Sequence, residues 1–260
     1  MSGPPRTPIA APELWVCQLG RVPYGEAMAM QASIRRRRQA GEVPDTLLLL
    51  EHPPVYTRGR RSSDSELPHG EDFYSSQGIE VVRTDRGGRV TYHGPGQLVG
   101  YPIMRIEDIH AYLRTMEAAI VAALADHGVL AHARAQEGPD FTGVWVGQRK
   151  IASIGVHVSR GVTTHGFAVN VENDLEPFSW IVACGLADVG MTSLAHELDA
   201  RRPEESCAPA LDCFRRRMAG SFCRAHGRRQ RLVWPARLGI DARPAPAPTR
   251  AGARPDAVAA

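Results

Sequence analysis

The segment from Gly143 to Val171 reads G-V-W-V-G-Q-R-K-I-A-S-I-G-V-H-V-S-R-G-V-T-T-H-G-F-A-V-N-V. It is rich in valine and isoleucine and is broken only by short polar turns at Gly147-Gln148 and Ser159-Arg160-Gly161. This pattern predicts three strands, at Gly143 to Val146, Lys150 to Val158 and His165 to Val171. Turns this short connect neighbouring antiparallel strands. The segment therefore predicts an antiparallel sheet at the centre of the fold.

The rest of the chain predicts further strands and well-separated helices. Strands are predicted at Leu14 to Leu19, Thr46 to Glu51, Val81 to Thr84, Arg89 to His93 and Leu98 to Met104. Helices are predicted at Tyr24 to Ala40, Asp108 to His127, Ser193 to Leu198 and Pro209 to His226. Because strands run together and helices are set apart from them, we expect an α+β fold with one mostly antiparallel or mixed sheet and flanking helices.

The chain divides by composition into a body and two ends. Residues 1–12 are broken by prolines and predict a loose N-terminal segment, and residues 13–240 predict one domain. Residues 241–260 consist mainly of alanine and proline, which predicts a disordered tail. The polar stretch from Arg58 to Gln77 is long for a connection inside a compact domain, so we expect a flexible or site-covering loop there.

Composition excludes several classes of function. The 43% hydrophobic and 23% charged residues are typical of a globular protein, and no apolar run approaches the roughly 18 residues of a membrane span. The proline-broken start lacks a secretory apolar segment, so we expect a cytoplasmic protein. Residues 242–260 hold three arginines and one aspartate and so supply +2 of the net charge of +3, which leaves the remaining body close to neutral and argues against nucleic-acid binding. The five cysteines include no C-x-x-C pair, so neither a disulfide framework nor a zinc site is predicted.

Lys150 is the only lysine among 31 basic residues. In a regular strand it begins a row with Ala152, Ile154, Val156 and Val158 that faces the core. A buried amine can lose its proton near neutral pH, whereas arginine stays charged, so Lys150 is a candidate acid or base. The alternative is a lysine that survived by chance and extends to solvent from the end of the strand.

The most unusual segment is R-G-G-R-V-T-Y-H-G-P-G-Q, from Arg86 to Gln97. Its four glycines allow the backbone to approach a ligand closely, and its polar side chains are of kinds that bind ligands. It is not a phosphate-binding loop of the G-x-x-x-x-G-K-[ST] type, since no lysine follows, and it does not open a helix as a dinucleotide-binding motif would. Two strands joined by glycine turns remain the alternative, which explains the glycines but not the polar residues.

Cys184 is the one cysteine beside a glycine and lies in a predicted loop, in V-A-C-G-L. Cys17, Cys213 and Cys223 fall in predicted strands or helices, where cysteine acts as a small apolar residue, and Cys207 falls in a connection. A cysteine nucleophile needs a nearby base or cation to form its thiolate. Lys150 or a histidine could serve, and a purely structural role for Cys184 stays open at this point.

The motifs together resemble the lipoyl(octanoyl) transferases. The first, R-G-G-x-x-T-Y-H-x-x-G-Q-x-x-x-Y, runs from Arg86 to Tyr101, and the others follow in the order of the family: K-I-A-S-I-G from Lys150, H-G-F-A-V-N from His165, D-L-E-P-F from Asp174, and Cys184-Gly185. The resemblance implies a fold similar to the catalytic domain of biotin and lipoate protein ligases. It also implies that Cys184 is the nucleophile and Lys150 its acid/base partner. It implies a substrate-binding site made of Arg86, Gly87, Gly88, Arg89, Val90, Thr91, Tyr92, His93, Ser153, Ile154, Gly155, Gly166, Phe167 and Ala168.

The same resemblance implies transfer of an octanoyl group from octanoyl-acyl carrier protein to a lysine of a lipoyl domain. The expected acceptors are lipoyl domains of 2-oxoacid dehydrogenases and the glycine cleavage H protein. No cofactor or metal, no membrane and no nucleic acid is expected, and the enzyme is expected to be a monomer. The chain departs from the family pattern at Ala183, where proline is usual, and at His157, where arginine is frequent.

Three alternatives differ in chemistry. An ATP-dependent lipoate or biotin protein ligase would activate the acid as an adenylate and would need no cysteine. A non-catalytic module that binds carrier proteins would not need both Cys184 and Lys150. A cysteine hydrolase would need a histidine beside Cys184, and no local protease signature is present.

Overall fold

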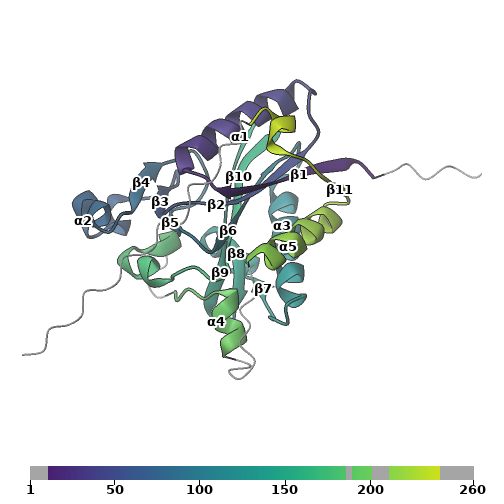
Figure 1. Cartoon of the computed structure of the whole chain (residues 1–260). Helices are drawn as coiled ribbons and strands as arrows, with labels where there is room; N and C mark the ends of the chain where they lie inside the picture. The colour runs from purple at the N-terminus through teal and green to yellow at the C-terminus, as the bar shows by residue number, and fades with distance from the viewer. Residues whose placement is uncertain (1–10, 186–188, 201–210, 241–260) are drawn as a thin grey trace, which may run out of the picture.

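The structure of the chain is a computed structural model that describes residues 11–185, 189–200 and 211–240. The predicted tail, nearly all of the loose N-terminal segment, and Cys207 lie outside the described residues. The described part contains one large sheet, one small sheet and flanking helices (Figure 1). The predicted α+β class with a mixed sheet is confirmed.

The large sheet has eight strands in the order β11-β1-β2-β6-β10-β9-β8-β7. Strands β11 and β2 both pair with β1 in parallel, and the remaining neighbours pair antiparallel. The strands are β1 (Glu13–Arg21), β2 (Thr46–Glu51), β6 (Gln97–Ile103), β7 (His132–Ala133), β8 (Gly143–Val146), β9 (Arg149–Ser159), β10 (Val162–Asn170) and β11 (Arg229–Leu232). The three strands predicted from the Gly143 to Val171 segment are therefore adjacent and antiparallel, as expected, although β10 begins three residues earlier than predicted.

Both faces of the large sheet are covered. Side chains alternate between the faces of a strand, so in β2 Leu47 and Leu49 enter one core cluster while Leu48 and Leu50 enter another. The first cluster is closed by helices α3 (Ile109–Ala125) and α5 (Leu211–Ala225), which pack on each other. The second lies beneath helix α1 (Tyr24–Gln39), which crosses the opposite face in Figure 1. Burial on both faces explains the continuous apolar run of β2.

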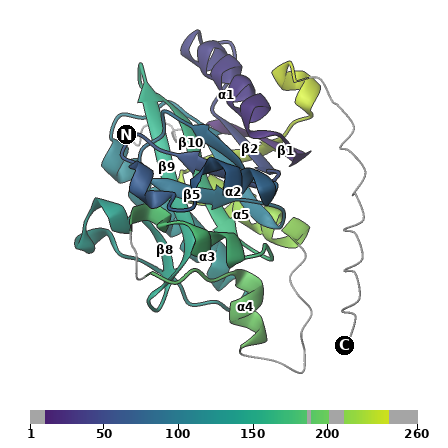
Figure 2. The same cartoon turned by 90° about the vertical axis from the view of Figure 1, so that its left-hand side faces the viewer.

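The segment from Arg58 to Gln77, predicted as a loop, leads from one strand to the next in a second, three-stranded sheet. The order of this sheet is β4-β3-β5, with β3 (Val55–Arg58) between β4 (Glu80–Arg83) and β5 (Val90–His93), and helix α2 (Gly70–Ser76) lies beside it (Figure 2). The predicted loop is thus partly a helix. Both β3 and α2 are too short for a clear periodic pattern, and tertiary burial of Tyr56 and Tyr74 decides their structure instead.

Other short elements also escape prediction. Strand β11 has four exposed residues and no alternating pattern, but its backbone pairs with β1. Helix α4 (Leu194–Asp199) was predicted, whereas the short 3-10 helices were not; these are η1 (Asp64–Glu66), η2 (Ala135–Glu137), η3 (Pro139–Phe141), η4 (Glu176–Trp180), η5 (Ala183–Gly185) and η6 (Pro235–Leu238). Within the described ranges, no helix is long and apolar enough to span a bilayer.

Asp108 caps helix α3, which forms one wall of the site described below. Its carboxylate accepts hydrogen bonds from the backbone N–H groups of His110, at 2.7 Å, and Ala111, at 3.2 Å. We expect Asp108→Ala to lower the free energy of unfolding by about 1 kcal/mol, measured by urea denaturation, because these N–H groups lose their acceptor. Asp108→Asn keeps an acceptor and should retain most of the stability. Equal losses in the two variants would contradict the capping role.

Candidate active site

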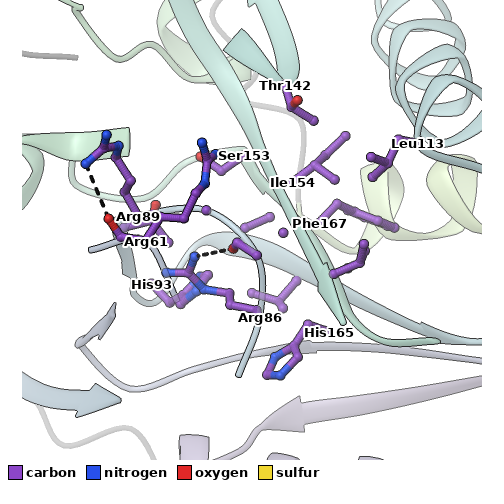
Figure 3. A pocket seen from close by; sticks show the side chains of 18 of the residues that line it. Arg61, Arg86, Arg89, His93, Leu113, Thr142, Ser153, Ile154, His165 and Phe167 are labelled. Carbon is purple, nitrogen blue, oxygen red and sulfur yellow. Dashed lines mark hydrogen bonds between the residues drawn. The ribbon is translucent and has the colours of Figure 1, made fainter. Parts of the chain in front are cut away.

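A cavity of about 290 Å³ lies where the small sheet meets β9, β10 and the start of α3. Figure 3 shows Leu113 and Phe167 on one side of it and Arg61 and Arg89 on the other. Most residues of the predicted substrate site line this cavity together with Lys150, namely Arg86, Gly87, Gly88, Arg89, Thr91, His93, Ser153, Ile154, Gly155, Gly166, Phe167 and Ala168. Segments far apart in the sequence thus meet around one space.

Two residues of the predicted site, Val90 and Tyr92, do not line the cavity. They are buried in the core cluster of the small sheet, where the ring of Tyr92 packs edge-on against Phe178. Successive residues of a strand point to opposite faces, so Thr91 and His93 of β5 face the cavity while Val90 and Tyr92 face away. The continuous range predicted from the motif has to be corrected for this alternation.

The cavity also includes residues that sequence reasoning missed. They are Tyr24, Arg61, Val99, Tyr101, Ile109, Leu113, Pro139, Asp140, Thr142, Val156 and His165. Two signals were present in the sequence: Ile109 and Leu113 are four residues apart on the apolar face of α3, and His165 adjoins the predicted Gly166 to Ala168 segment. Tyr24 and Asp140 carried no such signal, because long-range packing alone brings them to the site.

Lys150 is buried, with 2% of its surface exposed, so it does not extend to solvent. Its Nζ lies 5.1 Å from the centre of the Trp145 ring, at a distance typical of a cation–π contact. The strand is not regular at this point, because Val144 pairs with Ala152 whereas Trp145 pairs with Lys150, which leaves Ile151 as an extra residue. This bulge corrects the predicted alternating row, since it changes the direction of Lys150 relative to Ala152.

Backbone hydrogen bonds connect the loop that carries Cys184 to Glu66 and to Lys150. Cys184 lies in η5, and its side chain is outside the described part of the structure. On one side of η5, the N–H of Val182 donates to Glu66 O at 3.0 Å. Beyond η5, the N–H of Lys150 donates to Gly190 O at 2.9 Å and the N–H of Thr192 donates to Lys150 O at 3.0 Å. Lys150 therefore pairs directly with the chain that follows Cys184.

Gly185 brings this loop against Arg89. Its φ is +72°, a conformation that favours glycine, and a β-carbon at this position would overlap the side chain of Arg89. Arg89 in turn forms an ion pair with Glu66, at 2.8 Å from Nη1 to Oε1. The loop, β5 and η1 thus converge at the side of the cavity where Arg61 pairs with Asp140, at 2.9 Å. This is the more exposed side, since Arg61, Arg89 and Asp140 are all partly solvent-accessible.

The opposite end of the cavity is buried and polar. His165 has a φ of +57°, unusual for a residue other than glycine. Its Nε2–H donates to Asp85 at 2.7 Å, and its Nδ1 lies 3.4 Å from the Tyr24 hydroxyl. In a neutral ring, Nε2 therefore carries the proton and Nδ1 accepts from the hydroxyl. Burial lowers the pKa of His165 despite the opposing effect of Asp85. The same hydrogen bond lowers the pKa of Asp85 to about 2, so the carboxylate stays ionised beside a neutral imidazole.

Two further buried histidines are held neutral in the same way. His52 lies 2.6 Å from both Val22 O and the Tyr101 hydroxyl, so Nδ1–H donates to the carbonyl and Nε2 accepts from the phenol. Burial lowers the pKa of His52 to about 4 and that of His93 well below its usual range. His93 is further fixed by Gln97, whose Oε1 accepts from Nδ1 at 2.8 Å. The histidine and tyrosine rings at the buried end are therefore uncharged, while the ionised Asp85 and the buried guanidinium of Arg86 lie beside them.

Among the described residues, no group of three or more histidine, cysteine, aspartate or glutamate side chains is placed so that it could hold a metal ion.

The depressed pKa of His52 predicts acid sensitivity. Between pH 6.5, its usual value, and about 4, the unfolded chain binds a proton at this position that the folded chain does not, so stability falls as the pH falls through this window. We expect the loss in free energy of unfolding between pH 7.5 and pH 5 to be about 2 kcal/mol smaller in His52→Gln than in the wild type. Urea denaturation at both pH values measures it, and an unchanged loss would show that His52 is not the group responsible.

Comparisons with known proteins agree with this geometry. Residues 23–215 match the family model described as the lipoyl protein ligase A/B catalytic domain. The chain is 50% identical over 188 residues to an octanoyltransferase of Rubrobacter xylanophilus, covering 71% of this chain and 83% of that protein. It is also 50% identical over 182 residues to an octanoyltransferase of Solibacter usitatus, covering 68% of this chain and 80% of the relative.

Solved structures show the same fold at low sequence identity. A lipoate-protein ligase A bound with ATP superposes with a TM-score of 0.64 at 20% identity, covering 85% of this chain and 89% of that one. A putative lipoate protein ligase from T. acidophilum with bound lipoic acid gives 0.63 at 16% identity, covering 86% and 89%. The predicted likeness to lipoate protein ligases is thus confirmed for the fold. The family model and the identity to curated relatives together show that the chain belongs to the octanoyltransferase family, within the lipoyl protein ligase A/B catalytic domain.

Proposed function

We propose that the chain transfers an octanoyl group from octanoyl-acyl carrier protein to the ε-amine of a lysine on a lipoyl domain, through an acyl thioester on Cys184. Lipoyl domains of 2-oxoacid dehydrogenases and the glycine cleavage H protein are the proposed acceptors. The enzyme would work in the cytoplasm as a monomer. Membership of the octanoyltransferase family supports the acyl group and the reaction class.

The observation that carries the proposal is the position of the only lysine. Lys150 is buried in the wall of the cavity, and its own peptide pairs with the chain on either side of Met191, shortly after Cys184. A titratable amine held at that place supports the acid/base role that the family resemblance implies for it. An arginine would supply charge there but could not exchange protons.

One proton on the Cys184/Lys150 pair is enough for both half-reactions. In the first, the Cys184 thiolate forms a bond to the acyl carbon, the thioester bond of the carrier breaks, and the Lys150 ammonium gives its proton to the leaving thiolate. In the second, the acceptor amine attacks the acyl carbon and its surplus proton passes to neutral Lys150. The carbon–sulfur bond then breaks, which restores the thiolate and the ammonium.

The apolar side of the cavity suits the octanoyl chain. Ile109 and Leu113 from α3 and Phe167 from β10 line it, with Ile154 and Val156 of β9. Burying the seven carbons beyond the carbonyl contributes roughly 6 kcal/mol at about 0.8 kcal/mol per group. The glycines Gly155 and Gly166 keep the strands close to their neighbours, since a β-carbon on Gly155 would lie 2.8 Å from Gly87 O. The acyl chain would therefore lie along β9 and β10.

The structural neighbours include an ATP-bound ligase, so the adenylate mechanism needs a discriminating test. Incubation with octanoyl-acyl carrier protein and no nucleotide should produce one octanoyl group on Cys184, identified by mass spectrometry of the intact chain and its peptides, because the thioester itself supplies the activation. Addition of a lipoyl domain should remove the adduct and octanoylate one lysine of that domain.

Matched controls come from the other cysteines. Cys17 and Cys223 are buried, and burial raises the pKa of each thiol to about 11, so Cys17→Ser and Cys223→Ser should leave the adduct unchanged. Cys184→Ser should abolish it. An adduct on another cysteine, or transfer that requires ATP, would overturn the proposed mechanism.

A further inference from the structure

Glu117 is a buried carboxylate for which the proposed mechanism has no use. It lies in the middle of α3, on the side of the helix that faces β8, and 1% of its surface is exposed. A carboxylate this deeply buried is retained only where hydrogen bonds or charges compensate its lost hydration. The partners of Glu117 therefore indicate what it does.

The first partner is the backbone of Gly143, whose N–H donates to Glu117 Oε1 at 2.9 Å. Gly143 has a φ of +139°, and a β-carbon at this position would lie 2.8 Å from Cε of Lys150. The side chain of Lys150 thus lies directly against the glycine that Glu117 holds. Only a residue without a side chain leaves this path open.

The second set of partners is ionic. Arg114 Nη1 lies 2.7 Å from Glu117 Oε2, but the arginine side chain is 39% exposed and is hydrated as well as paired. Burial raises the pKa of Glu117, while the hydrogen bond from Gly143, the charge of Arg114 and the charge of Lys150 oppose that rise. Glu117 and Lys150 therefore interact electrostatically within a buried region.

We propose that Glu117 is the positioning residue of Lys150. Glu117 holds Gly143 in place, which fixes the path of the lysine side chain, and it is also a buried counter-ion that favours the ammonium form of Lys150. This inference rests on the proposed role of Lys150 as the acid/base group. Through its charge, Glu117 would keep the proton of the pair on Lys150, ready for the leaving thiolate. Glu117 itself would exchange no proton and would not touch the substrate.

Other charged groups around Lys150 act in both directions. Arg114 on α3 opposes Glu117, and the cavity wall adds Arg86 and Arg89 from the loop before β5 and Asp140 from η3. Arg89 and Asp140 are paired at the exposed side with Glu66 and Arg61 respectively. Glu117 is the buried anion that accepts a hydrogen bond from the backbone of Gly143, against which the Lys150 side chain lies. Removal of its charge should therefore affect Lys150 more than removal of any of the other charges.

The unique lysine makes the test direct. Protein grown with lysine labelled at the ε-carbon gives a single NMR signal from Lys150, whose titration midpoint can be followed with pH. Glu117→Gln keeps an acceptor for the Gly143 N–H and removes the charge, so the midpoint should move to lower pH by about one unit. Arg114→Gln removes the opposing cation on an accessible side chain, so the midpoint should move to higher pH.

Kinetics of the first half-reaction provide the second readout. In Glu117→Gln, we expect the rate constant for octanoyl-enzyme formation to fall about tenfold at neutral pH, with little change in KM for the carrier, since the cavity lining is intact. The matched control is Asp45→Asn, another buried carboxylate that accepts from a backbone N–H, that of Arg105, and pairs with Arg38 and Arg228. It is not part of the cavity and should leave the Lys150 midpoint unchanged.

The outcomes separate this inference from the proposed function. If Cys184 still acquires its octanoyl group in the wild type but neither Glu117→Gln nor Arg114→Gln moves the Lys150 midpoint, Glu117 is not its counter-ion. Equal shifts in Asp45→Asn would also overturn the inference, because the effect would then be general. Absence of the adduct on Cys184 in the wild type would overturn the proposed function while leaving the measured coupling between Glu117 and Lys150 in place.

Discussion

The burial of one lysine amine in the wall of the cavity is the constraint on which the rest of the site depends. Lys150 occupies the start of β9, where its N–H and C=O bond to Gly190 and Thr192 rather than only to the neighbouring strand. The strand that supplies the amine is thereby joined to the chain that follows Cys184. A bulge at Ile151 sets the direction of the lysine, and Trp145 and Gly143 provide the surfaces against which it lies.

The cavity has two chemically distinct ends. Paired charges of Arg61, Arg89, Asp140 and Glu66 surround the exposed side, whereas neutral histidine and tyrosine rings close the buried end. An uncharged network costs less to bury than ionised groups, because each ring finds a hydrogen-bond partner without carrying charge. The neutral rings therefore form this end of the cavity, with the charges of Asp85 and Arg86 beside them.

The sequence predicts the central elements because their signals are local. Alternation and short turns predict β8, β9 and β10, and helical periodicity predicts α1, α3 and α5 to within a few residues. The small sheet was not predicted as a unit, since β4 and β5 were predicted but β3, which lies between them and acquires its structure from pairing with both, was not. The same reason explains why β11, with exposed arginines, was missed.

For the site as well, the residues with a local sequence signal were predicted and those brought in by long-range packing were not. Glycines and polar residues close together in the sequence identified most of the cavity lining, but alternation within β5 removed Val90 and Tyr92 from it. Tyr24, Asp140 and Glu117 come from α1, η3 and α3, and only the packing of these elements brings them near β9 and β10. Residues whose part in the site arises from tertiary contacts alone leave no local pattern to detect.

Lys150→Arg distinguishes a lysine that moves a proton from one that only carries charge. The measurement is the single-turnover rate of octanoyl-enzyme formation at neutral pH, with circular dichroism to confirm the fold. We expect a folded variant whose rate falls at least about 100-fold, because a guanidinium cannot donate its proton to the leaving thiolate. A folded variant with a rate close to that of the wild type would show that positive charge alone is sufficient and that Lys150 moves no proton.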